Sequence, residues 1–169
     1  MRILMLTSVY KDEFLGNKDT STNIVNSFVK EWKKQGHEVL VIHNSHCYPR
    51  VIHEIPEKLK KSLAARMGFA ISDYDAVKEK EYQDNGVKVF RLPIKKFIPH
   101  SQPSDNVIKR QVNKIVATLK KEKFEPDVIT GHWASPQMEI ISELKTIYHC
   151  KTAVVLHGTG YIESDRKST

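Results

Sequence analysis

Cysteines and long apolar segments are both scarce in this sequence. Its 169 residues include only two cysteines, Cys47 and Cys150, whose separation fits neither a metal-binding pair nor a disulfide framework. No stretch approaches the roughly 20 apolar residues that cross a bilayer. The apolar opening, Met1–Ser8, is also too short for a secretory signal. We therefore expect a cytoplasmic protein with reduced thiols.

The sequence patterns of several common binding sites are missing as well. The spacing G-x-G-x-x-G does not occur, which disfavours ordinary dinucleotide binding. The histidines form no H-x-x-x-H or His/Cys ligand set, so no bound metal is expected. No aromatic residue interleaves with a basic run, so nucleic acid is not expected as a partner. The net charge of +7 permits an anionic partner but does not select one.

The composition is that of one globular domain. Hydrophobic residues make up 40% of the chain and charged residues 28%, with seven glycines and seven prolines, so neither disorder nor a fibrous repeat is indicated. The length fits a single domain that buries a sizeable core. We expect one domain over residues 1–161, which leaves open whether it is complete at its C-terminal end, and a polar, frayed tail over residues 162–169.

Short strands and amphipathic helices alternate along the chain. Gly36 stands where a left-handed cap is expected at the end of the first helix. Strands are expected at residues 2–8, 37–43, 87–92, 127–130 and 152–156. Helices are expected before residue 36, between residues 56 and 68, over residues 105–123, and from a cap and first-turn pair at residues 135 and 136. Residues 74–84 are too highly charged to assign. This order predicts a Rossmann-like, doubly wound, mostly parallel α/β sheet with helices on both faces.

Ligands of such a sheet bind beyond the carboxyl ends of its strands, so three loops are candidate sites. The first loop contains Gly16 and Asn17 ahead of a helix N-terminus, where a phosphate or a sugar hydroxyl would meet backbone N–H groups. The alternative is a turn at Gly16 followed by ordinary capping residues. The second loop contains His132 and Trp133, which suit hydrogen bonding to a sugar and stacking against its apolar face. The alternative is local packing at the sheet end.

The third loop follows the last expected strand and contains His157, Gly158 and Thr159. Its glycines let the backbone approach a ligand closely. His157 would donate a hydrogen bond to a sugar hydroxyl or titrate near neutral pH, which makes it the catalytic candidate. The alternative is a structural histidine.

The helix that begins at Pro56 is strongly basic. Lys58, Lys60, Lys61 and Arg66 surround its few apolar residues. Such a run is typical of a solvated helix face. The alternative is peripheral contact with an anionic membrane surface.

Five segments together resemble the N-terminal domain of glycosyltransferase 4 enzymes, which have the two-domain GT-B fold. They are the opening Met1–Ser8, the helix exit Gln35–Val39, the strand Gly86–Pro93, the stretch from Pro126 to Trp133, and the ending Val154–Thr159. Their order and intervals match the family over nearly the whole chain. The resemblance implies transfer of a sugar, with retention at the anomeric carbon, from a nucleotide-sugar donor to a glycan, lipid-linked or small-molecule acceptor, without a required metal or bound cofactor.

The resemblance also implies roles for the three loops. Gly16 and Asn17 would face the donor phosphate, although Asn17 stands where the family usually has a second glycine. His132 and Trp133 would lie near the acceptor. His157, with Gly158 and Thr159, would lie near the transferring sugar.

In this family the nucleotide-sugar pocket and a pair of glutamates lie in a second domain. Because a GT-B reaction needs both domains to position its reactants, we expect these 169 residues alone to transfer no sugar. Two alternatives remain open. One is a non-catalytic subunit that pairs with a separate donor-binding domain, and the other is a Rossmann-type nucleotide-binding module.

Overall fold

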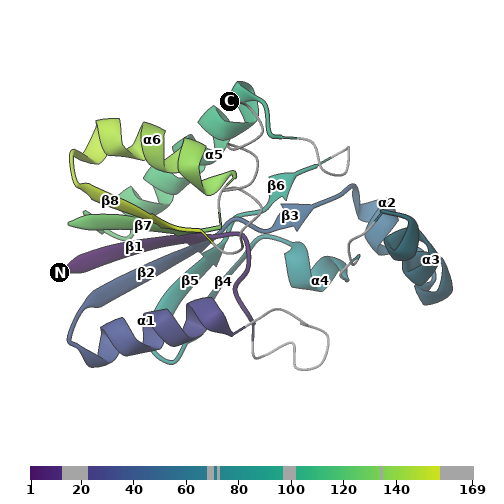
Figure 1. Ribbon diagram of the computed structural model, residues 1–169, viewed down its shortest axis with the longest axis horizontal. Helices are drawn as coiled ribbons and strands as arrows, with labels where there is room; N and C mark the ends of the chain where they lie inside the picture. The colour runs from purple at the N-terminus through teal and green to yellow at the C-terminus, as the bar shows by residue number, and fades with distance from the viewer. Residues whose placement is uncertain (13–22, 68–70, 72, 97–101, 134, 157–169) are drawn as a thin grey trace, which may run out of the picture.

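The computed structural model describes residues 1–12, 23–67, 71, 73–96, 102–133 and 135–156. A six-stranded sheet forms its centre, in the order β4-β5-β2-β1-β7-β8 (Figure 1). Every neighbouring pair is parallel except β4 and β5. The strands are β1 (Arg2–Thr7), β2 (Glu38–His43), β4 (Lys80–Asp84), β5 (Val87–Arg91), β7 (Val128–His132) and β8 (Lys151–Val155).

Helices cover both faces of this sheet (Figure 1). On one face, α1 (Ile24–Lys34) packs Val25 and Val29 with Ile3 and Met5 of β1. On the other face, α5 (Asp105–Lys121) and α6 (Gln137–Tyr148) pack with the alternate side chains of the same strand, including Leu4. A strand places successive side chains on opposite faces, so β1 contributes to both apolar layers. The predicted Rossmann-like α/β architecture is confirmed.

The first helix ends where its sequence predicts. Lys33 and Lys34 occupy its last turn, where positive charge is favoured by the helix dipole. Gln35 is the C-terminal cap, and Gly36 follows with a φ of 81°. Glycine adopts this left-handed backbone without the steric cost that a Cβ imposes, so Gly36 turns the chain toward β2.

Residues 74–84, left without an assignment from sequence, contain a short helix and an edge strand. They form α4 (Tyr74–Val77) and β4, which runs antiparallel beside β5. In β4 only Tyr82 and Asp84 are buried, and Asp84 is polar. The strand therefore lacks the alternation of apolar residues that marks a half-buried strand in a sequence.

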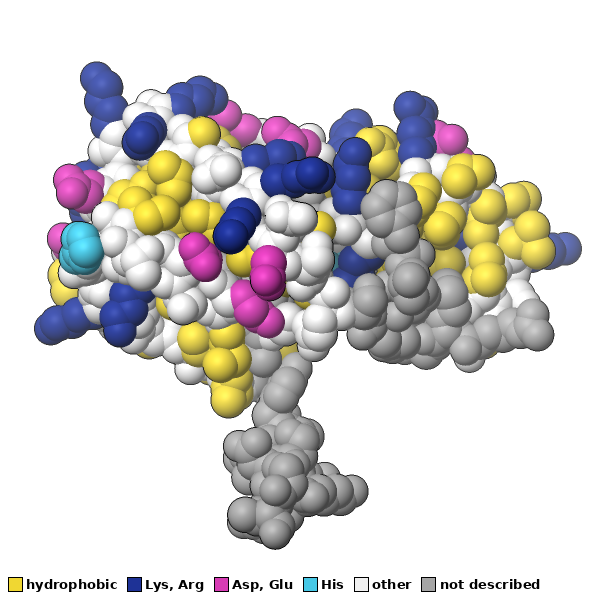
Figure 2. Space-filling view, turned by 90° about the horizontal axis from the view of Figure 1, so that it is seen from above, with side chains coloured by type: hydrophobic (Ala, Val, Ile, Leu, Met, Phe, Trp, Pro, Cys, Tyr) yellow, Lys and Arg dark blue, Asp and Glu magenta, His cyan; other side chains and the backbone are white. Residues whose placement is uncertain are grey.

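A small lobe extends beyond the carboxyl ends of β2 and β5 (Figure 1). It contains a parallel pair, β3 (His46–Cys47) and β6 (Ile94–Lys95), together with α2 (Arg50–His53) and α3 (Glu57–Met67). The helix predicted from Pro56 is confirmed as α3. Hydrophobic side chains gather on the surface at this end of the molecule (Figure 2), and among the described residues of α2 and α3 the large exposed ones are Val51, Leu59 and Leu63.

The basic run of α3 is expected to form a solvated helix face, and Lys60 departs from this expectation. Its side chain is 8% exposed, and its Nζ lies 2.6 Å from Asp73 Oδ1. Burying an ammonium group costs free energy because the group loses its hydration, and the ion pair with Asp73 offsets this cost. Lys58 and Lys61 are exposed, as expected.

Two expectations near the C-terminal half need correction. The fourth parallel strand extends to His132, so this residue belongs to β7 and not to the loop after it. Pro136 precedes the first residue of α6, and no side chain caps this helix. Pro136 occupies the cap position, so Ser135 lies one residue before it, with its Oγ 2.9 Å from the carboxylate oxygen Oε1 of Glu139.

Both cysteines are free thiols, as predicted, and Cys47 is buried. Within the described ranges, no helix has the length and apolar character that a membrane crossing requires. The expected tail, residues 162–169, lies outside the described residues.

Candidate functional site

The order in which strands are added to the sheet reverses between β1 and β7. This topological switch point is the first candidate site. The chain passes from β1 through α1 to β2 on one side of β1, whereas β7 pairs on its other side. Thr7, the last residue of β1, is in register with both His43 and His132. The loops that follow these strands therefore begin side by side, which is where open parallel sheets bind ligands.

A row of polar side chains crosses this end of the sheet on the face covered by α1. Arg91, His43, Thr7 and His132 end four neighbouring strands and are paired in register. All four are buried, with exposed fractions of 0 to 6%. The imidazole of His132 lies under α1, with its ring centroid 5.0 Å from that of Phe28. The row is thus a polar layer beneath the surface of the site.

Trp133 is the half-buried residue directly above this layer. Its backbone has a φ of 72°, a left-handed conformation that is costly for a bulky side chain. Its N–H donates to the carbonyl of Val155 over 3.1 Å, so β8 holds this backbone in place. Since His132 is fully buried and Trp133 is not, Trp133 is the member of the pair with surface to offer a ligand.

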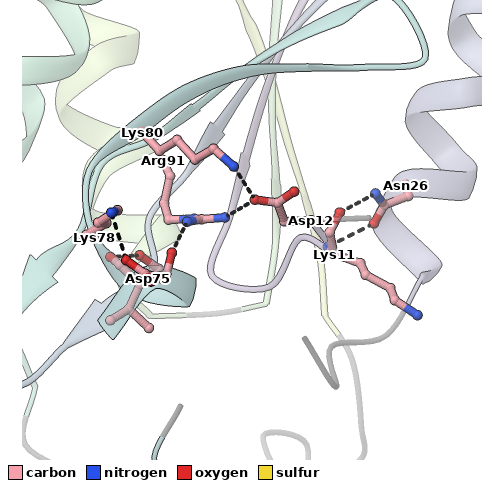
Figure 3. Close-up of polar contacts among 9 residues, drawn as sticks. Lys11, Asp12, Asn26, Asp75, Lys78, Lys80 and Arg91 are labelled. Carbon is pink, nitrogen blue, oxygen red and sulfur yellow. Dashed lines mark hydrogen bonds and ion pairs between the residues drawn. The ribbon is translucent and has the colours of Figure 1, made fainter. Parts of the chain in front are cut away.

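The start of the first loop is fixed by a buried ionic cluster (Figure 3). Asp12 Oδ2 lies 2.7 Å from Arg91 Nη2 and 3.1 Å from Lys80 Nζ, and both Asp12 and Arg91 are fully buried. Next to it, the Asn26 side chain accepts from the Lys11 N–H and donates to the Lys11 carbonyl. The loop therefore leaves the sheet from a point that β4, β5 and α1 define together.

Side-chain amides form a second network on the face covered by α5 and α6. Gln111 donates to Asn44 over 2.8 Å, Asn44 donates to Gln137 over 2.7 Å, and Gln137 donates to the Ser8 hydroxyl over 2.7 Å. Gln111, Asn44 and Gln137 are buried. A buried amide is costly unless its hydrogen bonds are made, so this chain fixes the positions of α5 and α6 against the ends of β1 and β2.

Five predicted site residues lie outside the described residues: Gly16, Asn17, His157, Gly158 and Thr159. Their roles stay predictions. Among the residues that the structure describes, no three His, Cys, Asp or Glu side chains gather in a way that could hold a metal ion.

The sequence analysis did not identify the residues of the ionic cluster around Asp12 or those of the amide network around Asn44. One signal was available for Gln111, which stands on the apolar face of α5 between Ile108 and Ile115. A second was available for Asn44, which follows the buried strand β2 directly. Nothing local marks Asp12 as a partner of Arg91, because 79 residues separate them in the sequence.

No protein-family model matches this sequence, and no curated protein is significantly similar to it. The resemblance to glycosyltransferase 4 enzymes therefore rests on the five sequence segments alone.

Proposed function

We propose that this chain is the acceptor-binding N-terminal domain of a retaining glycosyltransferase. In this proposal, a nucleotide-sugar donor binds mainly to a second domain outside the 169 residues. The transferred sugar passes to a glycan, a lipid-linked glycan or a small molecule held at the carboxyl ends of β1 and β7.

The observation that carries the proposal is the position of Trp133. It lies half-buried at the switch point of a parallel sheet, where ligands of such folds bind. An indole ring stacks on the apolar face of a sugar and leaves the sugar hydroxyls to polar groups. Ser8 supplies such a group, because its hydroxyl accepts from Gln137 and keeps its own proton for another acceptor.

His132 has a positioning role in this proposal. Its ring is buried beneath Phe28, so it supports the loop from below and makes no contact with the acceptor itself. The predicted donor-side residues are Gly16, Asn17, Gly158 and Thr159, with His157 as the catalytic candidate.

Acceptor binding is testable by fluorescence, because the sequence has only two tryptophans. In Trp32→Phe, Trp133 is the sole indole, and we expect the acceptor sugar to change its emission. The matched control, Trp133→Phe, keeps the indole of Trp32 on α1 and should give no change. A panel of mono- and disaccharides that changes neither emission would contradict sugar binding at Trp133.

Sugar transfer is tested on the native gene product with radiolabelled nucleotide sugars. We expect transfer with retention, and we expect Trp133→Ala to raise KM for the acceptor more than KM for the donor. The 169-residue chain alone should transfer nothing. A native gene product that neither transfers sugar nor hydrolyses any nucleotide sugar would contradict the proposal.

A further inference from the structure

The small lobe contains a pocket of its own, away from the switch point. The pocket has a volume of about 280 Å³ and lies among β3, β6, α2 and α4. Its lining includes the aromatic side chains Tyr48 and Tyr74 and the cationic side chains Arg50, Lys95 and Lys96. Pockets for drug-sized ligands typically measure about 300–1,000 Å³, so this one suits a smaller molecule.

The lining of the pocket carries positive charge only. Arg50, Lys95 and Lys96 come from two segments of the chain that lie far apart in the sequence, and no Asp or Glu is among the described residues that line the pocket. Like charges brought together in this way repel one another unless an anion lies between them. The lining therefore favours an acidic ligand.

Lys96 is half-buried. In the described part of the chain its ammonium group makes no hydrogen bond or ion pair. Burial lowers the pKa of Lys96, because the charged form has lost part of its hydration. His46 stays neutral beside it, since burial and then the charge of Lys96 lower its pKa to about 4.

The acidic side chains in and next to α2 and α4, the two helices beside the pocket, already pair with basic residues. Glu54 Oε1 lies 2.5 Å from Arg50 Nε on α2. Asp73 pairs with Lys60 over 2.6 Å, and Asp75 pairs with Lys78 over 2.7 Å. Arg50 thus lines the pocket with a partly balanced charge. Lys95 and Lys96 also line it, and neither forms an ion pair with any residue that the structure describes.

The two tyrosines are held by the histidine between them. The Tyr48 N–H donates to His53 Nε2 over 3.0 Å, and the rings of His53 and Tyr74 have centroids 5.9 Å apart. The guanidinium carbon of Arg50 lies 5.4 Å from the centroid of the Tyr74 ring. Fixed aromatic rings beside cations suit a ligand with both a ring and an acidic group.

We propose that this pocket binds a phosphate ester of a small ring compound, of the size of a monosaccharide phosphate. The phosphate oxygens accept from Lys95, Lys96 and Arg50, and the ring packs against Tyr48 and Tyr74. The site is separate from the switch point, and it does not depend on the proposed glycosyltransferase activity.

Isothermal titration calorimetry of the whole chain with glucose 1-phosphate tests this site at low ionic strength. We expect saturable binding, and we expect Lys96→Gln to weaken it by about tenfold or more, because a charge-assisted hydrogen bond to phosphate is lost. The matched control is Lys61→Gln, which removes the same charge from the exposed surface of α3 and should leave Kd within about twofold.

Two further probes separate the contributions of the phosphate and the ring. Glucose should not displace bound glucose 1-phosphate, and inorganic phosphate should bind more weakly than glucose 1-phosphate. Tyr74→Leu should reduce this difference, with folding checked by circular dichroism. Absence of glucose 1-phosphate binding, equal weakening by Lys61→Gln and Lys96→Gln, or equal affinity for phosphate and its ester would each overturn the proposal.

Discussion

Asp12 balances the charge of Arg91, a side chain with no exposed surface. We expect Asp12→Asn to lower the free energy of unfolding by about 3–5 kcal/mol, because it leaves a buried cation without its counterion. Urea denaturation measures this loss. The control is Glu38→Gln at the exposed pair with Arg2, where the loss should stay within about 1 kcal/mol. Equal losses for the two variants would contradict a structural role for the buried pair.

His46 makes stability depend on pH in a defined direction. Burial and the nearby charge of Lys96 lower its pKa from 6.5 to about 4. The unfolded chain therefore binds a proton in a range where the folded chain does not. We expect stability to fall by about 3 kcal/mol as the pH drops from about 6.5 to about 4, and this contribution to level off at lower pH.

Urea denaturation at pH 7, 5.5 and 4 measures this dependence, and His46→Gln should reduce its slope. The matched control is His149→Asn, an exposed position with a φ of 50° that asparagine tolerates. If His46→Gln keeps the full slope of the original chain, His46 is not its source.

At the scale of elements, Gly131 sets the distance between β7 and α6. A Cβ at this position would lie 2.7 Å from Ile141 Cδ1 and 3.1 Å from Gln137 Cβ. We expect Gly131→Ala to cost about 1–3 kcal/mol by overpacking. Ile141→Val alone should cost about 0.5–1.5 kcal/mol.

The double variant tests the contact directly. It removes the Cδ1 atom that the new methyl group meets, so its loss of unfolding free energy should be smaller than the sum of the single losses. A double-mutant cycle by urea denaturation measures this coupling. Additive losses would mean that the new methyl group does not press on Ile141 Cδ1 and that α6 shifts to accommodate it in another way.

The elements that sequence predicts best are those with a repeated apolar pattern. α1 and α5 each bury one face against the sheet, and the parallel strands have continuous apolar runs, so local sequence is sufficient. β3, β6 and α4 are too short for any periodicity. The inward side of β4 is polar at Asp84, which pairs with Tyr10 and Asn26 instead of entering an apolar layer.

The site is less predictable than the fold because its contacts join distant segments. Sequence singles out His132 and Trp133 as candidates from their place near the end of a strand, although His132 is the last residue of β7 itself. It does not reveal that Gln137, Asn44 and Gln111 form one network, since this depends on the order of strands and on which helix faces lie opposite them. The amides stay buried because each finds a partner that the fold brings to it.

At the scale of the whole molecule, the six-stranded sheet and the small lobe differ in how they are stabilised. Both apolar clusters lie against the sheet, and none of the α3 side chains that the structure describes belongs to either. The buried side chain described in α3 is Lys60, held by Asp73. Regions with few apolar contacts open at lower free energy than the core, so we expect α3 to open while the sheet stays folded.

Native-state hydrogen exchange at increasing urea concentrations measures this difference. Amides of α3 should exchange through an opening of low free energy and weak urea dependence, whereas those of β1 should exchange through global unfolding. Asp73→Asn should lower the opening free energy of α3 by about 1–3 kcal/mol and leave β1 unchanged. Asp75→Asn, which breaks an exposed pair two residues away, is the control. If α3 and β1 exchange with the same free energy and the same urea dependence, the lobe and the sheet unfold as one unit, and the Lys60–Asp73 pair contributes to the stability of both.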